Sequence, residues 1–206
     1  MFRRAAFAAI VLAPLAAFAT DTSASPTMES ATDGCLVTGD GYLRARVRGA
    51  LTLDLDWKNA DMQCEGGPRP PGKNGSNGVR VSIGGPERGD GRRIRIVFGV
   101  AGVGEGRGGE ALRTNVTLLF EGEQRIFATR GDDKCTVDKL EQQRVGSLGD
   151  ARAIYRVVGR GFCLGPATGL SRGERVFLTS FDFAGRIEFV DDDRHAPPPP
   201  PPASKP

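Results

Sequence analysis

Between residues 34 and 190 the chain alternates apolar and polar side chains in short runs, which Gly- and Pro-containing segments separate. A period of two and an enrichment in β-branched and aromatic residues are typical of half-buried strands. The pattern predicts strands at 42–48, 51–57, 79–83, 93–100, 114–120, 124–129, 152–159 and 175–183. Residues 138–148 alone offer a short helical alternative. We therefore predict an all-β fold, a single antiparallel β-sandwich of jelly-roll-like type with long Gly-rich loops and two disulfides.

The first two runs also predict a register. Their apolar side chains alternate with three arginines in 42–48 and with two aspartates in 51–57. Directly paired residues lie on the same side of a sheet, so a three-residue loop at 49–51 is needed to bring apolar opposite apolar. The predicted pairs are Ala45 with Leu55, Val47 with Leu53, Arg44 with Asp56 and Arg46 with Asp54. The charged face that results is either a polar ligand-binding surface or a set of solvent-exposed ion pairs.

A further apolar series lies near the C-terminal end of the domain. Its members all occupy odd positions: Phe177, Phe181, Phe183, Ile187 and Phe189. They belong either to one long strand bent at Gly185 or to the two arms of a tight hairpin that turns at 184–185. In both cases we predict that they form core rather than an aromatic binding platform.

The N-terminus has the features of an export signal. The basic segment MFRR precedes a short apolar stretch that ends in Ala17-Phe18-Ala19, which predicts a signal peptide at 1–19 with cleavage near Ala19. The stretch is shorter than the roughly 20 residues that span a bilayer, so no membrane span is predicted. Arg3-Arg4 is either an ordinary positive region or a twin-arginine signal. The predicted location is periplasmic or secreted.

The ends of the mature chain differ from the domain in composition. Residues 20–33 are small and polar, which predicts a flexible leader before the β-sandwich domain at 34–190. Residues 191–206 are first acidic and then Pro-rich, with six prolines at 197–202. This tail is either disordered or an extended spacer.

Four cysteines remain after cleavage, an even number in a chain bound for an oxidising compartment. Three pairings are possible. We favour Cys35 with Cys64 and Cys135 with Cys163, because each pair closes one local loop of similar length. No two cysteines are close enough in sequence for the paired ligands of a zinc site.

The charge of the mature chain argues against a nucleic-acid partner. The sequence has 28 basic and 25 acidic residues, and loss of Arg3 and Arg4 leaves a net charge of about +1. Nucleic-acid binders depend on a strong basic excess that neutralises phosphates. The expected partner is instead an envelope protein or glycan of unknown identity.

Two glycine motifs resemble nucleotide-binding loops but lack what such loops need. Gly104-x-Gly106-x-x-Gly109 is followed after four residues by another β-rich run, which leaves no room for the helix that holds a pyrophosphate. Gly67-x-x-x-x-Gly72-Lys73 has Asn74 where a P-loop has Ser or Thr, and it contains three prolines, which lack N–H donors. Neither motif predicts nucleotide binding.

No catalytic constellation is evident. The single histidine, His195, lies beside the proline tail, and neither a nucleophile-elbow nor a zinc-protease motif is present. A carboxylate pair for glycoside cleavage is defined in space and has no signature in sequence. We predict no catalytic and no cofactor-binding residues. Arg130-Gly131-Asp132 matches an adhesion tripeptide, which arises easily by chance in an Arg- and Gly-rich chain.

Calcium is the one metal ion for which the sequence offers candidate ligands. Asp132, Asp133 and Asp138 surround Cys135, and three more aspartates occupy 191–193. Calcium takes six to eight oxygen ligands, often from loops, so each cluster is either a weak calcium site or a solvated acidic loop.

These features together predict an exported, non-catalytic binding module. The alternative is an envelope hydrolase, or a hydrolase inhibitor that uses 66–78 as a protruding loop; either could be stabilised by calcium.

Overall fold

The computed structural model describes residues 34–70, 77–149, 151–170 and 173–190 of the chain. The predicted signal peptide, the leader up to residue 33 and the acidic and Pro-rich tail lie outside these residues. The strands are β1 (Tyr42–Gly49), β2 (Leu53–Lys58), β3 (Gln63–Pro68), β4 (Gly78–Gly84), β5 (Arg93–Ala101), β6 (Gly109–Glu121), β7 (Arg125–Ala128), β8 (Cys135–Leu148), β9 (Arg152–Cys163), β10 (Ala167–Gly169) and β11 (Arg175–Val190). A single 3-10 turn, Asn59–Asp61, joins β2 to β3. Among the described residues no helix has the length and apolarity needed to cross a membrane.

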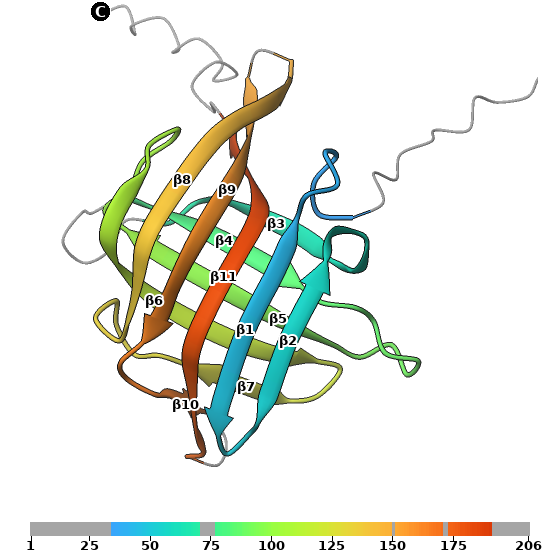
Figure 1. The fold of residues 1–206 in the computed structure, drawn as a ribbon, viewed down its shortest axis with the longest axis vertical. Coiled ribbons are helices and arrows are strands. Elements are labelled where there is room, and N and C mark those ends of the chain that lie inside the picture. Colours follow the sequence, from blue (N-terminus) through green and yellow to red (C-terminus); the bar gives the residue numbers. More distant parts are fainter. Residues whose placement is uncertain (1–33, 71–76, 150, 171–172, 191–206) are drawn as a thin grey trace, which may run out of the picture. The chain divides into compact units, whose positions relative to one another are not determined.

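All eleven strands belong to one antiparallel sheet that folds over on itself. One layer has the order β2-β1-β11-β9-β8 and the other the order β3-β4-β5-β6-β7 (Figure 1). Strand β6 connects the layers, since its first half pairs with β8 and its second half with β5 and β7. At the other end β10 pairs with both β7 and β11. The predicted all-β antiparallel fold class is confirmed.

The predicted strands are all present, and three further strands, β3, β8 and β10, were not predicted. The helical alternative at 138–148 is wrong, because these residues lie in β8. A bulge at Asp138 interrupts the alternation of β8, since the buried Val137 and Leu140 are three residues apart. The Gly-rich segment after β5 leads directly into antiparallel β6, as predicted.

The predicted register of the first hairpin is confirmed. Strand β1 pairs with β2 so that apolar side chains meet on the inner side and charged ones on the outer side. The observed pairs include Ala45 with Leu55, Val47 with Leu53, Arg44 with Asp56 and Arg46 with Asp54. Leu43, Ala45 and Val47 are buried, so the requirement that apolar face apolar correctly selected this register.

An aromatic cluster joins the two layers. The ring of Phe98 in β5 lies 4.6 Å from that of Phe183 and 4.9 Å from that of Phe181, both in β11 (centroid to centroid). All three side chains are buried. Such aromatic contacts contribute about 0.5–1.5 kcal/mol per pair beyond the burial of apolar area.

The C-terminal apolar series lies on one long strand rather than on a hairpin. Phe181, Phe183 and Ile187 belong to the core as predicted, whereas Phe177 is 37% exposed. A bulge in the pairing of β11 with β1 leaves Thr179 without a register partner and reverses the alternation. Val176 and Leu178, at even positions, are buried in its place.

Both predicted disulfides are present. Cys35–Cys64 connects the segment before β1 to β3 in the other layer, and Cys135–Cys163 joins two directly paired residues of β8 and β9. By loop entropy each cross-link contributes about 3–4 kcal/mol to stability.

The bulge at Thr179 predicts different effects for two phenylalanines of β11. Replacing Phe181 with Ala should lower the free energy of unfolding by about 3–5 kcal/mol, because a buried aromatic contact across the layers is lost. The same change at Phe177 should cost about 1 kcal/mol or less, since this ring lies outside the core. Denaturant unfolding of both variants measures the difference; equal losses would contradict the reversal at Thr179.

Candidate functional site

The outward surface of the β2-β1-β11-β9-β8 layer is lined by charged side chains. The alternation that buries Leu43, Ala45 and Val47 directs the intervening residues outward. The five strands adjoin one another (Figure 1) and therefore present one polar surface, which we call the charged face. Its members are Asp54, Asp56 and Lys58 on β2, Arg44, Arg46 and Arg48 on β1, Asp182 on β11, Arg160 on β9, and Lys139 and Glu141 on β8.

Two hollows adjoin each other on the charged face. The first, of about 470 Å³, lies over β2, β1 and β11 and is lined by the three arginines of β1 and the two aspartates of β2. The second, of about 290 Å³, lies over β1, β11, β9 and β8 and is lined by Tyr42, Val158, Arg160, Lys139 and Glu141. Asp182 lines both hollows and thus forms the boundary between them.

Ion pairs occupy part of the charged face, and the partner of Asp54 differs from the one that the register suggested. Asp54 pairs with Arg48 at 2.7 Å rather than with Arg46, which lies directly opposite it. The remaining pairs of the first hairpin are Arg44 with Asp56 at 3.6 Å and Lys58 with Asp56 at 2.9 Å. All these groups are well exposed, so each pair contributes at most about 1 kcal/mol to stability.

Two cations of the charged face are not neutralised in this way. Arg46 and Arg160 are exposed, and neither makes an ion pair within the part of the chain that the structure describes. Lys139 pairs with Glu141 on its own strand, and the hydrogen bond and charge of Glu141 raise the pKa of Lys139. The guanidinium groups of Arg46 and Arg160 thus offer charged donors to a ligand.

Tyr42 lines the second hollow and contacts Asp182 of the charged face. Its hydroxyl donates a hydrogen bond of 2.8 Å to Asp182. Partial burial raises the pKa of Tyr42, and the hydrogen bond and negative charge of Asp182 raise it further. Arg44 lies over the ring at 5.1 Å from its centroid. Tyr42 therefore stays a hydrogen-bond donor that holds Asp182 in place.

The outer side of the other layer provides a contrast. Arg93 and Arg95 on β5 are largely buried at their side chains, 13% and 16% exposed, and each is paired with glutamates. Arg93 pairs with Glu87 and Glu121, and Arg95 with Glu65 and Glu121. These arginines are satisfied within the domain and are not available to a ligand.

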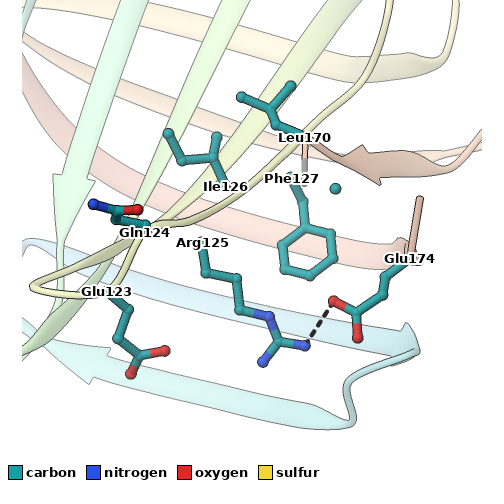
Figure 2. A pocket seen from close by; sticks show the side chains of 8 residues that line it. Glu123, Gln124, Arg125, Ile126, Phe127, Leu170 and Glu174 are labelled. Carbon is teal, nitrogen blue, oxygen red and sulfur yellow. Dashed lines mark hydrogen bonds and ion pairs between the residues drawn. The ribbon is translucent and has the colours of Figure 1, made fainter. Parts of the chain in front are cut away.

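A third pocket, of about 400 Å³, lies where β7 begins and β10 ends. Figure 2 shows Arg125 at its centre, with Glu174 on one side and Glu123 on the other. Arg125 pairs with Glu174 at 3.1 Å, and its guanidinium lies over the rings of Phe120 and Phe127. Glu123 is within 3.4 Å of Arg92. Both carboxylates of this end pocket are thus engaged by arginines.

The three candidate metal ligands are not brought together as a site. Asp132 pairs with Arg69 at 2.7 Å and accepts a hydrogen bond from Asn115 at 3.0 Å. Asp133 pairs with Lys134, and Asp138 is exposed at the bulge of β8. Over the described ranges there is no group of three side chains that could hold a metal ion.

The Gly-rich segment 102–108 is a closed loop with partners of its own. Gln142 on β8 donates hydrogen bonds to the carbonyls of Gly104 and Arg107 and accepts one from the amide of Gly106. The hydroxyl of Tyr155 donates to Glu105 at 3.0 Å. A dinucleotide-binding loop offers backbone N–H donors to phosphate, and here the N–H of Gly106 is used by a side chain of the same domain.

Several residues singled out in the sequence lie outside the described residues. They are His195, the aspartates at 191–193, and positions 71–76, which include half of the P-loop-like motif at 67–74 and nearly half of the proposed inhibitor loop at 66–78. Of that loop, Gly66, Gly67 and Pro68 belong to β3. Arg130 and Gly131 are exposed, whereas the third residue of the adhesion tripeptide is the Asp132 engaged by Arg69.

The sequence pointed to the Arg–Asp ladder of the first hairpin but missed the second hollow. Lys139 and Glu141 were missed because β8 was not recognised as a strand. Arg160 and Asp182 meet only through the long-range pairing of β9 with β11. Arg156, Val158 and Arg160 alternate with the buried residues of β9. This pattern in the sequence predicts that the outer side of β9 is basic.

No protein-family model matches the chain, and comparison with curated proteins and with solved structures finds no significant match.

The contact between Tyr42 and Asp182 predicts a titration. Asp182→Asn removes the negative charge that disfavours the phenolate, so the pKa of Tyr42 should fall. In the parent protein this pKa lies above the ordinary value of about 10, so the hydrogen bond contributes to stability below that pH and is lost as the pH rises through the raised pKa.

The control for this titration is the other tyrosine of the chain, Tyr155. Burial and the hydrogen bond to Glu105 also raise its pKa. Phenolate absorbance followed against pH should show one transition shifting down in Asp182→Asn and the other in Glu105→Gln. If Asp182→Asn leaves both transitions in place, Asp182 does not accept the Tyr42 hydrogen bond.

Proposed function

We propose that this chain is an exported, non-catalytic binding module that recognises an envelope protein or glycan through its charged face. The module would act in the periplasm or outside the cell after cleavage near Ala19. The observation that carries the proposal is the pair of adjoining hollows, in which Arg46 and Arg160 offer charged donors on either side of Asp182.

The strands that carry the charged face favour binding by a preformed surface. The residues that line the hollows lie on strands rather than loops, and Asp182 is held by Tyr42. The Cys135–Cys163 disulfide lies on the two strands that carry Lys139 and Arg160. Side chains that are already ordered lose less entropy when they bind a ligand.

Export is supported by independent features of the sequence and the fold. The N-terminal sequence has the basic, apolar and small-residue regions of a signal peptide. All four cysteines form disulfides, which persist in oxidising compartments and are rare in the reducing cytosol.

The second candidate is a hydrolase, which a specific observation favours: Glu123 and Glu174 line one pocket (Figure 2). Glycosidases use two carboxyl groups that flank the scissile bond, one of which must deliver a proton. Here Arg125 lies between the two carboxylates and pairs with Glu174. The binding module is therefore the better-supported function.

Export predicts the chemical form of the mature protein. The intact mass of protein isolated from its native envelope should correspond to a chain that starts at Thr20. Reduction should add the mass of four thiol hydrogens, because both disulfides open. A chain that retains Met1–Ala19, or one whose mass does not change on reduction, would argue against export to an oxidising compartment.

The role of the charged face is tested by charge reversal. Immobilised mature protein should retain an envelope component, and the double variant Arg46→Glu/Arg160→Glu should lose at least about tenfold in retention, because attraction becomes repulsion. Arg80→Glu is the matched control, since Arg80 is exposed on the outer side of β4 in the other layer. Equal retention by all three proteins would exclude the charged face as the surface that binds the envelope component.

The same envelope material separates the two candidate functions. A binding module should leave it chemically intact. Release of soluble fragments by the parent protein, abolished in Glu174→Gln, would instead identify the end pocket as a hydrolase site.

A further inference from the structure

The charged face contains a pair of like charges whose placement points to a ligand. Lys139 on β8 and Arg160 on β9 are direct cross-strand partners. Like charges directly opposite each other destabilise a sheet. An anion that binds between the two side chains would relieve this repulsion.

A second like-charge pair on the same strand shows how the domain neutralises such a contact by itself. Arg156 on β9 lies directly opposite Arg186 on β11. Arg156 pairs with Asp40 at 2.8 Å, and Arg186 pairs with Glu188 at 3.0 Å. Each of these arginines has a carboxylate of its own. In the first pair Lys139 has Glu141, whereas Arg160 makes no ion pair within the described ranges.

The acidic side chains between the cations restrict the chemistry of the ligand. Asp182 is a direct partner of Arg160, and Glu141 lines the same hollow. A polymer with a phosphate at every step would meet these carboxylates as well as the arginines. A ligand rich in hydroxyl groups would instead donate hydrogen bonds to Asp182 and Glu141, because ionised carboxylates only accept.

The second hollow also has an apolar border. The side chains of Tyr42 and Val158, both half-buried, line it beside Arg160. Apolar walls with a few directed polar groups are typical of sites for small organic units. The ring of a sugar combines the required parts, a C–H face for Val158 and hydroxyls for the carboxylates.

We propose that the charged face binds an acidic polysaccharide, with Arg160 and Arg46 each binding a carboxylate of the glycan and Asp182 accepting sugar hydroxyls between them. This inference rests on the proposed function and names its ligand class. Arginine suits carboxylates because its planar guanidinium binds both oxygens at once. The two hollows adjoin, so one chain of sugars would cross both.

The experiment measures the affinity of the mature protein for three polymers by titration calorimetry. Polygalacturonate carries carboxylates and hydroxyls, dextran carries hydroxyls only, and poly-L-glutamate carries carboxylates only. Polygalacturonate should bind at least about tenfold more tightly than either of the others, since only it satisfies both sets of groups. Its affinity should fall as salt is raised.

Variants place the binding on the charged face. Arg160→Gln should weaken polygalacturonate binding about tenfold, the value of one charge-assisted hydrogen bond, and Arg46→Gln/Arg160→Gln about a hundredfold. Arg160→Lys should restore part of the loss. Arg80→Gln, an equal loss of charge in the other layer, should stay within about twofold. Unchanged thermal unfolding confirms that each variant is folded.

Each contrary result has a distinct meaning. Equal binding of dextran would overturn carboxylate recognition, and equal binding of poly-L-glutamate would point to an acidic protein; both leave the proposed binding function standing. Binding that is lost in Arg80→Gln but kept in Arg46→Gln/Arg160→Gln would overturn the placement. If no polymer binds while envelope material is still retained through the charged face, the ligand class alone is wrong.

Discussion

The packing of Phe98 against Phe181 and Phe183 determines much of the remaining structure. These rings meet across the two layers, and they find room because β9 has glycines directly opposite them, Gly161 and Gly159. A Cβ atom at Gly161 would lie 2.8 Å from the ring of Phe181, and one at Gly159 would lie 2.7 Å from that of Phe183. The aromatic cluster therefore holds β9 and β11 in one register.

The same register positions two charged residues. Because side chains alternate across a strand, Arg160 and Asp182, which lie between the core residues, must point outward and stand side by side. The core thus positions the centre of the charged face.

Sequence patterns predicted what depends on neighbouring residues. The register of the first hairpin followed from a single rule, that apolar side chains must face each other, and the even number of cysteines in a chain predicted to be exported indicated the two disulfides. The strand that follows the Gly-rich loop was predicted correctly, because the chain after Gly109 has the pattern of a strand. In each case the deciding interaction lies within a few residues or closes a short loop.

Two strands departed from the predicted pattern at a β-bulge. One extra residue at Asp138 interrupts the alternation of β8, and one at Thr179 exchanges the inner and outer sides of β11, so that Phe177 is exposed. A bulge has no clear signature in a single sequence, because it depends on the partner strand. For the same reason the second hollow was out of reach: it requires β1, β11, β9 and β8 to be neighbours, and these pairings join residues far apart in the chain. The charges were visible in the sequence, whereas their juxtaposition was not.

The disulfide Cys135–Cys163 has a further role when it is considered together with the charged face. It links β8 and β9 close to Lys139 and Arg160, two like charges that lie directly opposite each other on the same two strands. A cross-link that contributes about 3–4 kcal/mol exceeds the cost of one exposed like-charge contact, which is at most about 1 kcal/mol. The domain can therefore keep two cations side by side without losing the pairing of β8 with β9. The covalent bond and the aromatic core thus supply stability that the exposed charges do not have to supply, an arrangement that suits the proposed recognition surface.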